Sequence, residues 1–146
     1  MSDDKTENAQ NRKKHKAPKG KTTEHTLESG DGKLEYTATA EWIVLTTNEK
    51  PRAEMFHVSY VKRDEPSGGR PVTFVFNGGP GASSAYLHVG AIGPKRVLLN
   101  EDGTSHKPPA KLLDNEESWL AFTDLVFVDP IGTGFSRTIE AQGKPE

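Results

Sequence analysis

The 146-residue sequence contains no cysteine, so disulfide bonds, thiolate nucleophiles and thiolate metal sites are excluded. It has no uninterrupted apolar run near the ~20 residues that a membrane-spanning helix needs. Large apolar residues are missing between Met1 and Leu27, so no apolar segment typical of a signal peptide follows Met1. We therefore expect neither a membrane partner nor a signal peptide. The compartment stays open between the cytoplasm and export of a mature form.

The first 25 residues are highly charged, with seven Lys or Arg against four Asp or Glu. A segment of this kind cannot bury enough apolar surface to offset the entropy lost on ordering. We expect residues 1–25 to form a disordered charged tail and residues 26–146 to form one domain. Basic tails can bind nucleic acid, but acidic residues are interspersed here and no aromatic side chain can stack on a base. The sequence therefore predicts a solvating tail and no nucleic-acid partner.

An antiparallel hairpin is predicted in the first half of the domain. Residues 34–45 are rich in strand-forming residues and are followed by a turn that contains Asn48 and Pro51. Residues 53–61 then form a second candidate strand. Because a short turn separates the two segments, we expect them to pair with each other.

Two short apolar runs, at 72–76 and 125–128, are predicted to be buried strands with both faces covered. A short helix over about 83–89 lies between them, and minor elements are expected at 96–99 and 115–122. Two buried strands joined by a helical crossover indicate a parallel pair. The predicted fold class is therefore α/β, with an antiparallel hairpin leading into parallel strands.

The most informative segment is the turn that follows the first of these strands, Asn77-Gly78-Gly79-Pro80-Gly81. Glycines allow a sharp turn and leave the backbone N–H groups uncovered by side chains. Bare N–H groups beside a helix N-terminus attract negative charge. The segment is predicted to bind an anion or a developing oxyanion.

Nucleotide-binding loops fit the sequence poorly. No segment matches Gly-x-x-x-x-Gly-Lys-Ser/Thr, the loop that cradles phosphates in many nucleoside triphosphatases. Gly132 and Gly134 match the start of a dinucleotide fingerprint, but Arg137 stands where its third glycine should be. We therefore expect no nucleotide cofactor.

A nucleophile elbow of the form Gly-x-Ser-x-Gly has a near match at residues 81–85. The elbow serine should follow its strand almost directly, whereas Ser83 lies seven residues beyond the predicted strand. His88 would share the same short helix and His106 lies in a polar loop, so neither is well placed as a base. Ser83 and Ser84 are predicted to be helix caps or hydroxyls that brace the loop.

Metal binding has little support, because the five histidines are scattered without a His-x-x-x-His pair. Asp129, directly after the second buried strand, has two interpretations. It could be a ligand or an acid, or it could order the following loop by accepting backbone N–H bonds around residues 132–134. The second interpretation is favoured, and no metal is expected.

The glycine segment resembles the Asn-Gly-Gly-Pro-Gly-x-Ser-Ser signature of serine carboxypeptidases, which have the α/β-hydrolase fold. A second block is similar to that family too: Asn115, Ser118 and Trp119, followed by residues 125–136, Leu-Val-Phe-Val-Asp-Pro-Ile-Gly-Thr-Gly-Phe-Ser. The resemblance covers about residues 30–140. It implies the N-terminal part of such a domain.

The resemblance also implies roles for three residues. Gly79 would donate its backbone N–H to the oxyanion of the tetrahedral intermediate. Asn77 and Gly78 would bind the free α-carboxylate of a peptide substrate, which makes the enzyme an exopeptidase. No cofactor is implied.

The sequence departs from the family pattern at several positions. Val75 stands where many members have tryptophan, Ala82 where many have cysteine, and Pro130 directly follows Asp129 where many members have one more residue between them. The family's nucleophile lies in Gly-Glu-Ser-Tyr, which does not occur in this sequence. We therefore transfer no nucleophile, acid or base, and expect a truncated product or the first part of a longer reading frame.

The sequence thus predicts a serine-type carboxypeptidase whose oxyanion and carboxylate loop lies in this chain, with the 146 residues inactive by themselves. Two alternatives stay open. One is a non-catalytic or vestigial fragment that binds a carboxylate or peptide. The other is an acyltransferase or esterase on the same scaffold.

Overall fold

The computed structural model describes residues 15–29, 32–66 and 68–139. The strands are β1 (Lys21–Ser29), β2 (Gly32–Thr47), β3 (Lys50–Lys62), β4 (Val72–Val75), β5 (Lys95–Val97), β6 (Leu112–Asp114), β7 (Asp124–Val128) and β8 (Arg137–Thr138). The helical elements are short: α1 (Ala85–Leu87), the π-helical turn η2 (His88–Ile92) and the 3₁₀ turn η3 (Trp119–Ala121).

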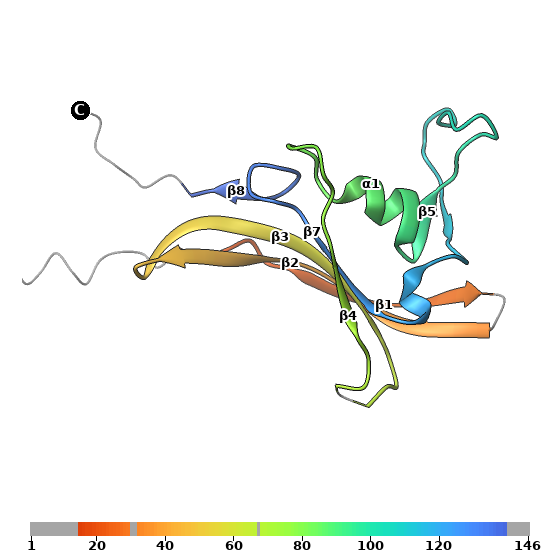
Figure 1. Ribbon diagram of the computed structural model, residues 1–146, viewed down its shortest axis with the longest axis horizontal. Coiled ribbons are helices and arrows are strands. Elements are labelled where there is room, and N and C mark those ends of the chain that lie inside the picture. The colour runs from red at the N-terminus through yellow and green to blue at the C-terminus, as the bar shows by residue number, and fades with distance from the viewer. Residues whose placement is uncertain (1–14, 30–31, 67, 140–146) are drawn as a thin grey trace, which may run out of the picture.

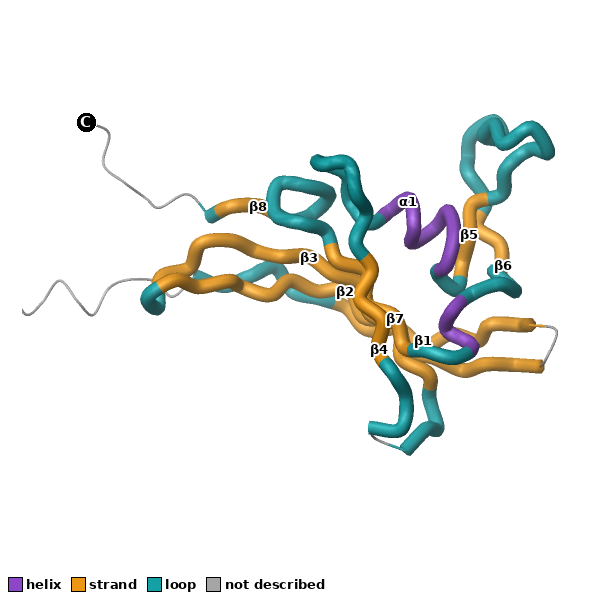
Figure 2. Tube along the Cα trace, viewed as in Figure 1, coloured by secondary structure: helices purple, strands orange, loops and turns teal. Residues whose placement is uncertain are grey.

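The main sheet combines antiparallel and parallel pairs, as the sequence predicts. Its strand order is β1-β2-β3-β7-β4, with β8 paired to one end of β3. The strands β4 and β7 run parallel, and the chain between them carries α1 and η2 (Figure 1). The expected hairpin is formed by β2 and β3, which are the long curved strands of Figure 2. The chain therefore has a partial α/β fold in which strand dominates.

β1 begins at Lys21, inside the stretch expected to be a tail. It pairs with β2 from Lys21 opposite Ala40 to Ser29 opposite Gly32. The pairing uses backbone groups, and most of its side chains are polar and exposed, so a count of apolar residues does not reveal the strand. Residues 1–14 of the expected tail lie outside the described residues.

The hydrophobic core lies on one face of the main sheet. Leu125 and Phe127 of β7 are fully buried, and Val75 of β4 and Leu120 of η3 join them. Leu87 and Ile92 pack against this cluster from α1 and η2. The short helical elements therefore cover the face of the sheet that holds the core.

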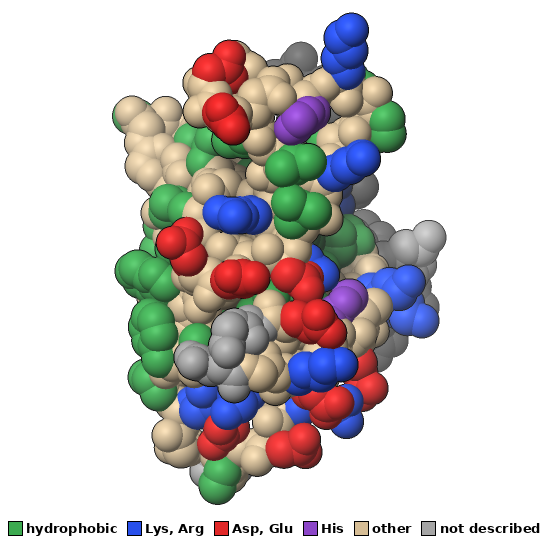
Figure 3. Space-filling model, turned by 90° about the vertical axis from the view of Figure 1, so that its right-hand side faces the viewer, with side chains coloured by type: hydrophobic (Ala, Val, Ile, Leu, Met, Phe, Trp, Pro, Cys, Tyr) green, Lys and Arg blue, Asp and Glu red, His purple; other side chains and the backbone are tan. Residues whose placement is uncertain are grey.

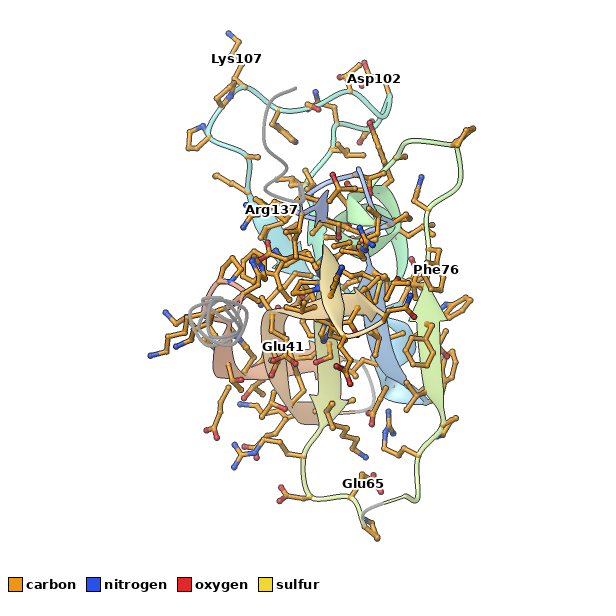
Figure 4. The ribbon with its side chains drawn as sticks, turned by 90° about the vertical axis from the view of Figure 1, so that its left-hand side faces the viewer. Glu41, Glu65, Phe76, Asp102, Lys107 and Arg137 are labelled. Atoms are coloured by element: carbon orange, nitrogen blue, oxygen red, sulfur yellow. The ribbon has the colours of Figure 1, made fainter. Side chains whose placement is uncertain are left out.

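β4 differs from the prediction of a strand covered on both faces. Val75 is buried, but Val72, Phe74 and Phe76 are more than half exposed. β4 is the last strand of the sheet, and Phe76 points away from the other strands in Figure 4. Hydrophobic side chains also line the left margin of Figure 3, the side on which β4 lies. A continuous apolar run was therefore an insufficient guide to burial at the edge of the sheet.

The predicted helix over 83–89 is replaced by α1 and the wider turn η2. The turn ends where the N–H of Gly93 donates to the carbonyl of His88 at 3.1 Å. A side chain at residue 93 would place its Cβ 2.1 Å from that carbonyl oxygen, so the turn can close only over glycine.

A separate two-stranded sheet, β5 and β6, projects from this point (Figure 1). The N–H of Asn115, just after β6, donates to the carbonyl of Pro94, just before β5, at 3.0 Å. One backbone hydrogen bond therefore joins the residues that flank the segment 95–114.

A buried carboxylate fastens β8 to β3. Glu54 accepts hydrogen bonds from Nε of Arg137 at 2.6 Å and from Nε2 of His15 at 2.7 Å. Burial acts to raise the pKa of Glu54, but the bonds from His15 and Arg137 outweigh it, so the pKa is lowered. The ionised Glu54 thus holds the loop between β7 and β8 at the end where β8 begins.

Candidate functional site

The glycine loop, residues 77–83, follows the carboxyl end of β4. Gly78 to Gly81 are exposed. Gly81 has φ of +98°, a conformation that residues with a side chain rarely adopt. An ideal Cβ on Gly79 would lie 3.4 Å from the nitrogen of Gly81 and 3.3 Å from that of Ala82, so the loop turns back tightly on itself.

The backbone donors of this loop are not used within the described part of the chain. The N–H groups of Gly78, Gly79 and Gly81 form no hydrogen bond there. The carboxamide of Asn77 folds onto the loop, where Nδ2 donates to the carbonyl oxygen of Gly78 at 3.2 Å. The loop therefore presents several N–H donors to solvent, an arrangement that can accept an anionic oxygen.

Asp129 lies at the end of β7 and is 5% exposed. Its Oδ1 accepts from the N–H and the hydroxyl of Ser84, both at 2.9 Å. Its Oδ2 accepts from the N–H of Phe135 at 3.1 Å. The carboxylate thus orders the loop that follows it, as the favoured interpretation of the sequence predicts, and it also binds the chain at the end of the glycine loop.

The 130–136 loop has its own support. The hydroxyl of Ser136 donates to the carbonyl oxygen of Asp129 at 2.6 Å and accepts from the N–H of Phe56 in β3 at 2.7 Å. The indole Nε1 of Trp42 in β2 donates to the carbonyl oxygen of Phe135 at 3.0 Å. No local pattern in the sequence indicates these contacts, although Ser136 and Phe135 belong to the block that resembles the family.

The two serines lie in different surroundings. Ser84 stands at the N-cap position of α1, but its side chain makes no capping hydrogen bond, and its hydroxyl instead donates to Asp129. It therefore braces the loop, one of the two roles expected for it. Ser83 is half-buried beside the turn at Gly134, with its Cβ 2.9 Å from where a Cβ on that glycine would lie.

The ring of His88 packs against core residues. Its Nε2 lies 2.6 Å from the hydroxyl of Tyr60, and its ring stacks on Phe127 with centroids 4.4 Å apart. Burial lowers the pKa of His88 to about 4, against a smaller opposing effect from the charge of Asp129. His106 is exposed in the loop between β5 and β6. Neither histidine is placed as a base for Ser83 or Ser84.

Asn115 and Ser118 hold the end of η2. The buried carboxamide of Asn115 donates through Nδ2 to the carbonyls of Ala91 at 2.7 Å and Gly93 at 2.8 Å. The hydroxyl of Ser118 donates to the carbonyl of Ile92 at 3.0 Å. These residues connect the second block to the helical segment after the glycine loop, a role that the sequence analysis did not assign.

The described residues contain no cluster of three or more His, Cys, Asp or Glu side chains that could hold a metal ion. In the same part of the chain, no helix has the length and apolar character needed to cross a bilayer.

Comparison with known proteins gives one consistent result. The serine carboxypeptidase family model matches residues 32–145. Serine carboxypeptidase ctsa-3.2 of Caenorhabditis elegans is 35% identical over 97 residues, which is 66% of this chain and 17% of the relative. Pheromone-processing carboxypeptidase KEX1 of Saccharomyces cerevisiae is 47% identical over 68 residues, 46% of this chain and 8% of the relative.

A plant relative, serine carboxypeptidase-like 33 of Arabidopsis thaliana, is 33% identical over 96 residues, 64% of this chain and 18% of the relative. The chain thus spans less than a fifth of the length of each of these three relatives. Because the family model covers most of the chain, including the glycine loop and the Asp129 loop, the chain belongs to the serine carboxypeptidase family.

Proposed function

We propose that this chain carries the anion-binding loop of a serine-type carboxypeptidase, which releases C-terminal residues from peptides. In this role the N–H of Gly79 stabilises the oxyanion that forms when a seryl hydroxyl attacks the last peptide carbonyl. Asn77 and Gly78 bind the free α-carboxylate of the substrate. The nucleophile and its base are not assigned to any residue of the chain.

One observation carries the proposal most directly. Gly78, Gly79 and Gly81 are exposed residues, and their N–H groups form no hydrogen bond within the described residues. Ready-made donors cost no reorganisation when charge develops beside them, and loss of one oxyanion donor commonly lowers the rate ~10²–10³-fold. Family membership supplies the reaction class for which such donors are needed.

Binding of the carboxylate can be measured on the 146-residue chain. We would titrate it with an N-acetyl amino acid and with the matching N-acetyl amino-acid amide, and follow the amide resonances of Gly78, Gly79 and Gly81. The free acid is expected to shift these resonances, and the uncharged amide to leave them in place. Equal effects of the two compounds would contradict a carboxylate site.

Asn77→Asp supplies a variant with the same shape and an added negative charge in the loop. It should weaken binding of the free acid about tenfold or more, because a carboxamide donor is lost and like charges repel. Asn48→Asp is the matched control, because it adds the same charge in the turn between β2 and β3.

Hydrolysis is a second readout. The assay uses a polypeptide that contains this chain and also supplies the seryl nucleophile. It should hydrolyse an N-blocked dipeptide with a free C-terminus much faster than the C-terminally amidated analogue. If the chain binds the free acid without hydrolysing the dipeptide, the result favours a binding fragment over a complete catalyst.

A further inference from the structure

The conformation of the glycine loop depends on how its two ends are held. At the start, β4 pairs in parallel with β7 up to Val75 opposite Phe127. Between the ends, Gly78 to Gly81 are exposed, and the N–H groups of Gly78, Gly79 and Gly81 make no hydrogen bond within the described residues. Glycine-rich backbone has more conformational freedom than any other, so such a loop keeps one shape only if its ends are fixed.

The far end is fixed by Asp129. The carboxylate accepts from both the N–H and the hydroxyl of Ser84, the residue before α1. Hydrogen bonds to a charged acceptor are about twice as strong as neutral ones. α1 spans only three residues, so the contact with Asp129 is the stronger support at this point.

Asp129 is itself held on several sides. Its N–H donates to the carbonyl of Phe56 at 3.0 Å, its carbonyl accepts from Ser136, and its Oδ2 accepts from Phe135. Gly134, with φ of +51°, lies so close that a Cβ there would be 1.9 Å from Oδ2. In Figure 1 the loop after β4 and the loop after β7 lie beside each other, which agrees with these contacts.

We propose that Asp129 is a positioning residue that holds the glycine loop in the shape that presents the N–H groups of Gly78 and Gly79 to a carboxylate or an oxyanion. The ligand in this proposal rests on the proposed function. Asp129 does not touch the ligand in this account and acts through Ser84. The cluster of Asp129, Ser84, Phe135 and Gly134 is called the carboxylate clasp below.

Electrostatic repulsion alone and the positioning role predict opposite effects of Asp129→Asn on binding. A buried negative charge next to an anion-binding loop repels the anion, so its removal by Asp129→Asn should tighten binding if the carboxylate had no positioning role. The clasp predicts weaker binding, because an amide cannot accept from Ser84 and Phe135 together with both of its terminal atoms. The sign of the change therefore separates the two explanations.

Two glycine substitutions test the clasp without changing its charge. Gly134→Ala drives a methyl group into Oδ2 of Asp129, whereas Gly132→Ala, with φ of +85°, meets no atom within 4 Å. Both variants carry the strain of a side chain in a left-handed conformation. They differ in what the new Cβ meets, which at residue 134 is the carboxylate of Asp129 and, at 2.9 Å, the Cβ of Ser83.

The probe is N-acetylglycine, titrated into the 146-residue chain and into each variant, with amide resonances followed as before. We expect Asp129→Asn and Gly134→Ala to bind roughly tenfold more weakly, the effect of one charge-assisted hydrogen bond, and Gly132→Ala to bind as the parent does. Without ligand, the two clasp variants, Asp129→Asn and Gly134→Ala, should also show shifted resonances for Ser84, Gly78 and Gly79, with those of β1 unchanged.

Each result decides the matter. If Asp129→Asn binds N-acetylglycine as tightly as the parent does, or more tightly, the positioning role is overturned and the proposed function still stands. If the parent does not bind N-acetylglycine, the proposed function fails, and the unliganded spectra still test the clasp. Resonances of Gly78 and Gly79 that do not move in either clasp variant would then reject it. If Asp129→Asn does not fold, Gly134→Ala against Gly132→Ala tests the clasp at unchanged charge.

Discussion

Acid should destabilise this domain through His88. The imidazole lies against Phe127 and Tyr60, and burial lowers its pKa from the ordinary value of 6.5 to about 4. The folded state therefore binds the proton less readily than the unfolded state. Between pH 6.5 and 4 the unfolded chain takes up a proton that the folded chain refuses, so stability falls as the pH is lowered.

The size of the effect follows from the shift. Each pKa unit corresponds to about 1.4 kcal/mol, so the shift of His88 predicts a loss of roughly 3 kcal/mol between pH 7 and pH 4. Below pH 4 the folded state is protonated as well and this contribution stops changing. The loss is a large share of the ~5–15 kcal/mol that small domains have in total.

Urea unfolding at a series of pH values, followed by tryptophan fluorescence, measures the loss. His88→Gln should flatten the pH dependence between 6.5 and 4, because the titrating group is gone, while His106→Gln in the exposed loop should leave it as it is. A direct check is the proton titration of the His88 ring by NMR, which should show no protonation above about pH 5. A midpoint near 6.5, or equal pH dependence in His88→Gln and the parent, would refute the argument.

Asn115→Ala should lower the free energy of unfolding by about 3 kcal/mol, because the carbonyls of Ala91 and Gly93 lose their partner. Asn100→Ala, in an exposed loop, is the control in the same urea experiment, and a difference below about 1 kcal/mol between the two would count against this role. Phe74→Thr should reduce self-association measured by sedimentation, because Phe74 is 62% exposed on the edge strand β4. Tyr86→Thr, which removes an exposed aromatic ring from α1, should reduce it less, and an equal effect would show that the edge is not responsible.

The backbone of the sheet could be predicted from local patterns. Alternation and β-branched residues locate β2, β3, β4 and β7, and the helical crossover predicts the parallel pair. β1, β6 and β8 were harder to predict. β1 has a polar, exposed sequence, β6 has three residues and β8 two, so their pairing is decided by partners distant in the chain.

Prediction of the site divides in a similar way. Glycines that follow a strand indicate exposed backbone N–H donors, even when the group that they bind is unknown. An acidic residue at the end of a strand indicates a carboxylate that orders the next loop. The contact of Asp129 with Ser84 joins residues 45 positions apart, so no local pattern could reveal it. The same holds for Asn115, whose acceptors are the carbonyls of a π-helical turn that the sequence does not predict. Roles for Asn77, Gly78 and Gly79 stay predictions.

The return of residues 95–114 to their starting point has a consequence for protein engineering. The backbone bond between Asn115 and Pro94 closes this excursion at its base, and the carboxamide of Asn115 closes it again at Gly93. Loop-closure entropy rises slowly with length, so the tip can be shortened, exchanged or extended at small thermodynamic cost. The tip at residues 101–110 is thus a natural place to graft a reporter peptide or an affinity tag, with the glycine loop and the carboxylate clasp left untouched.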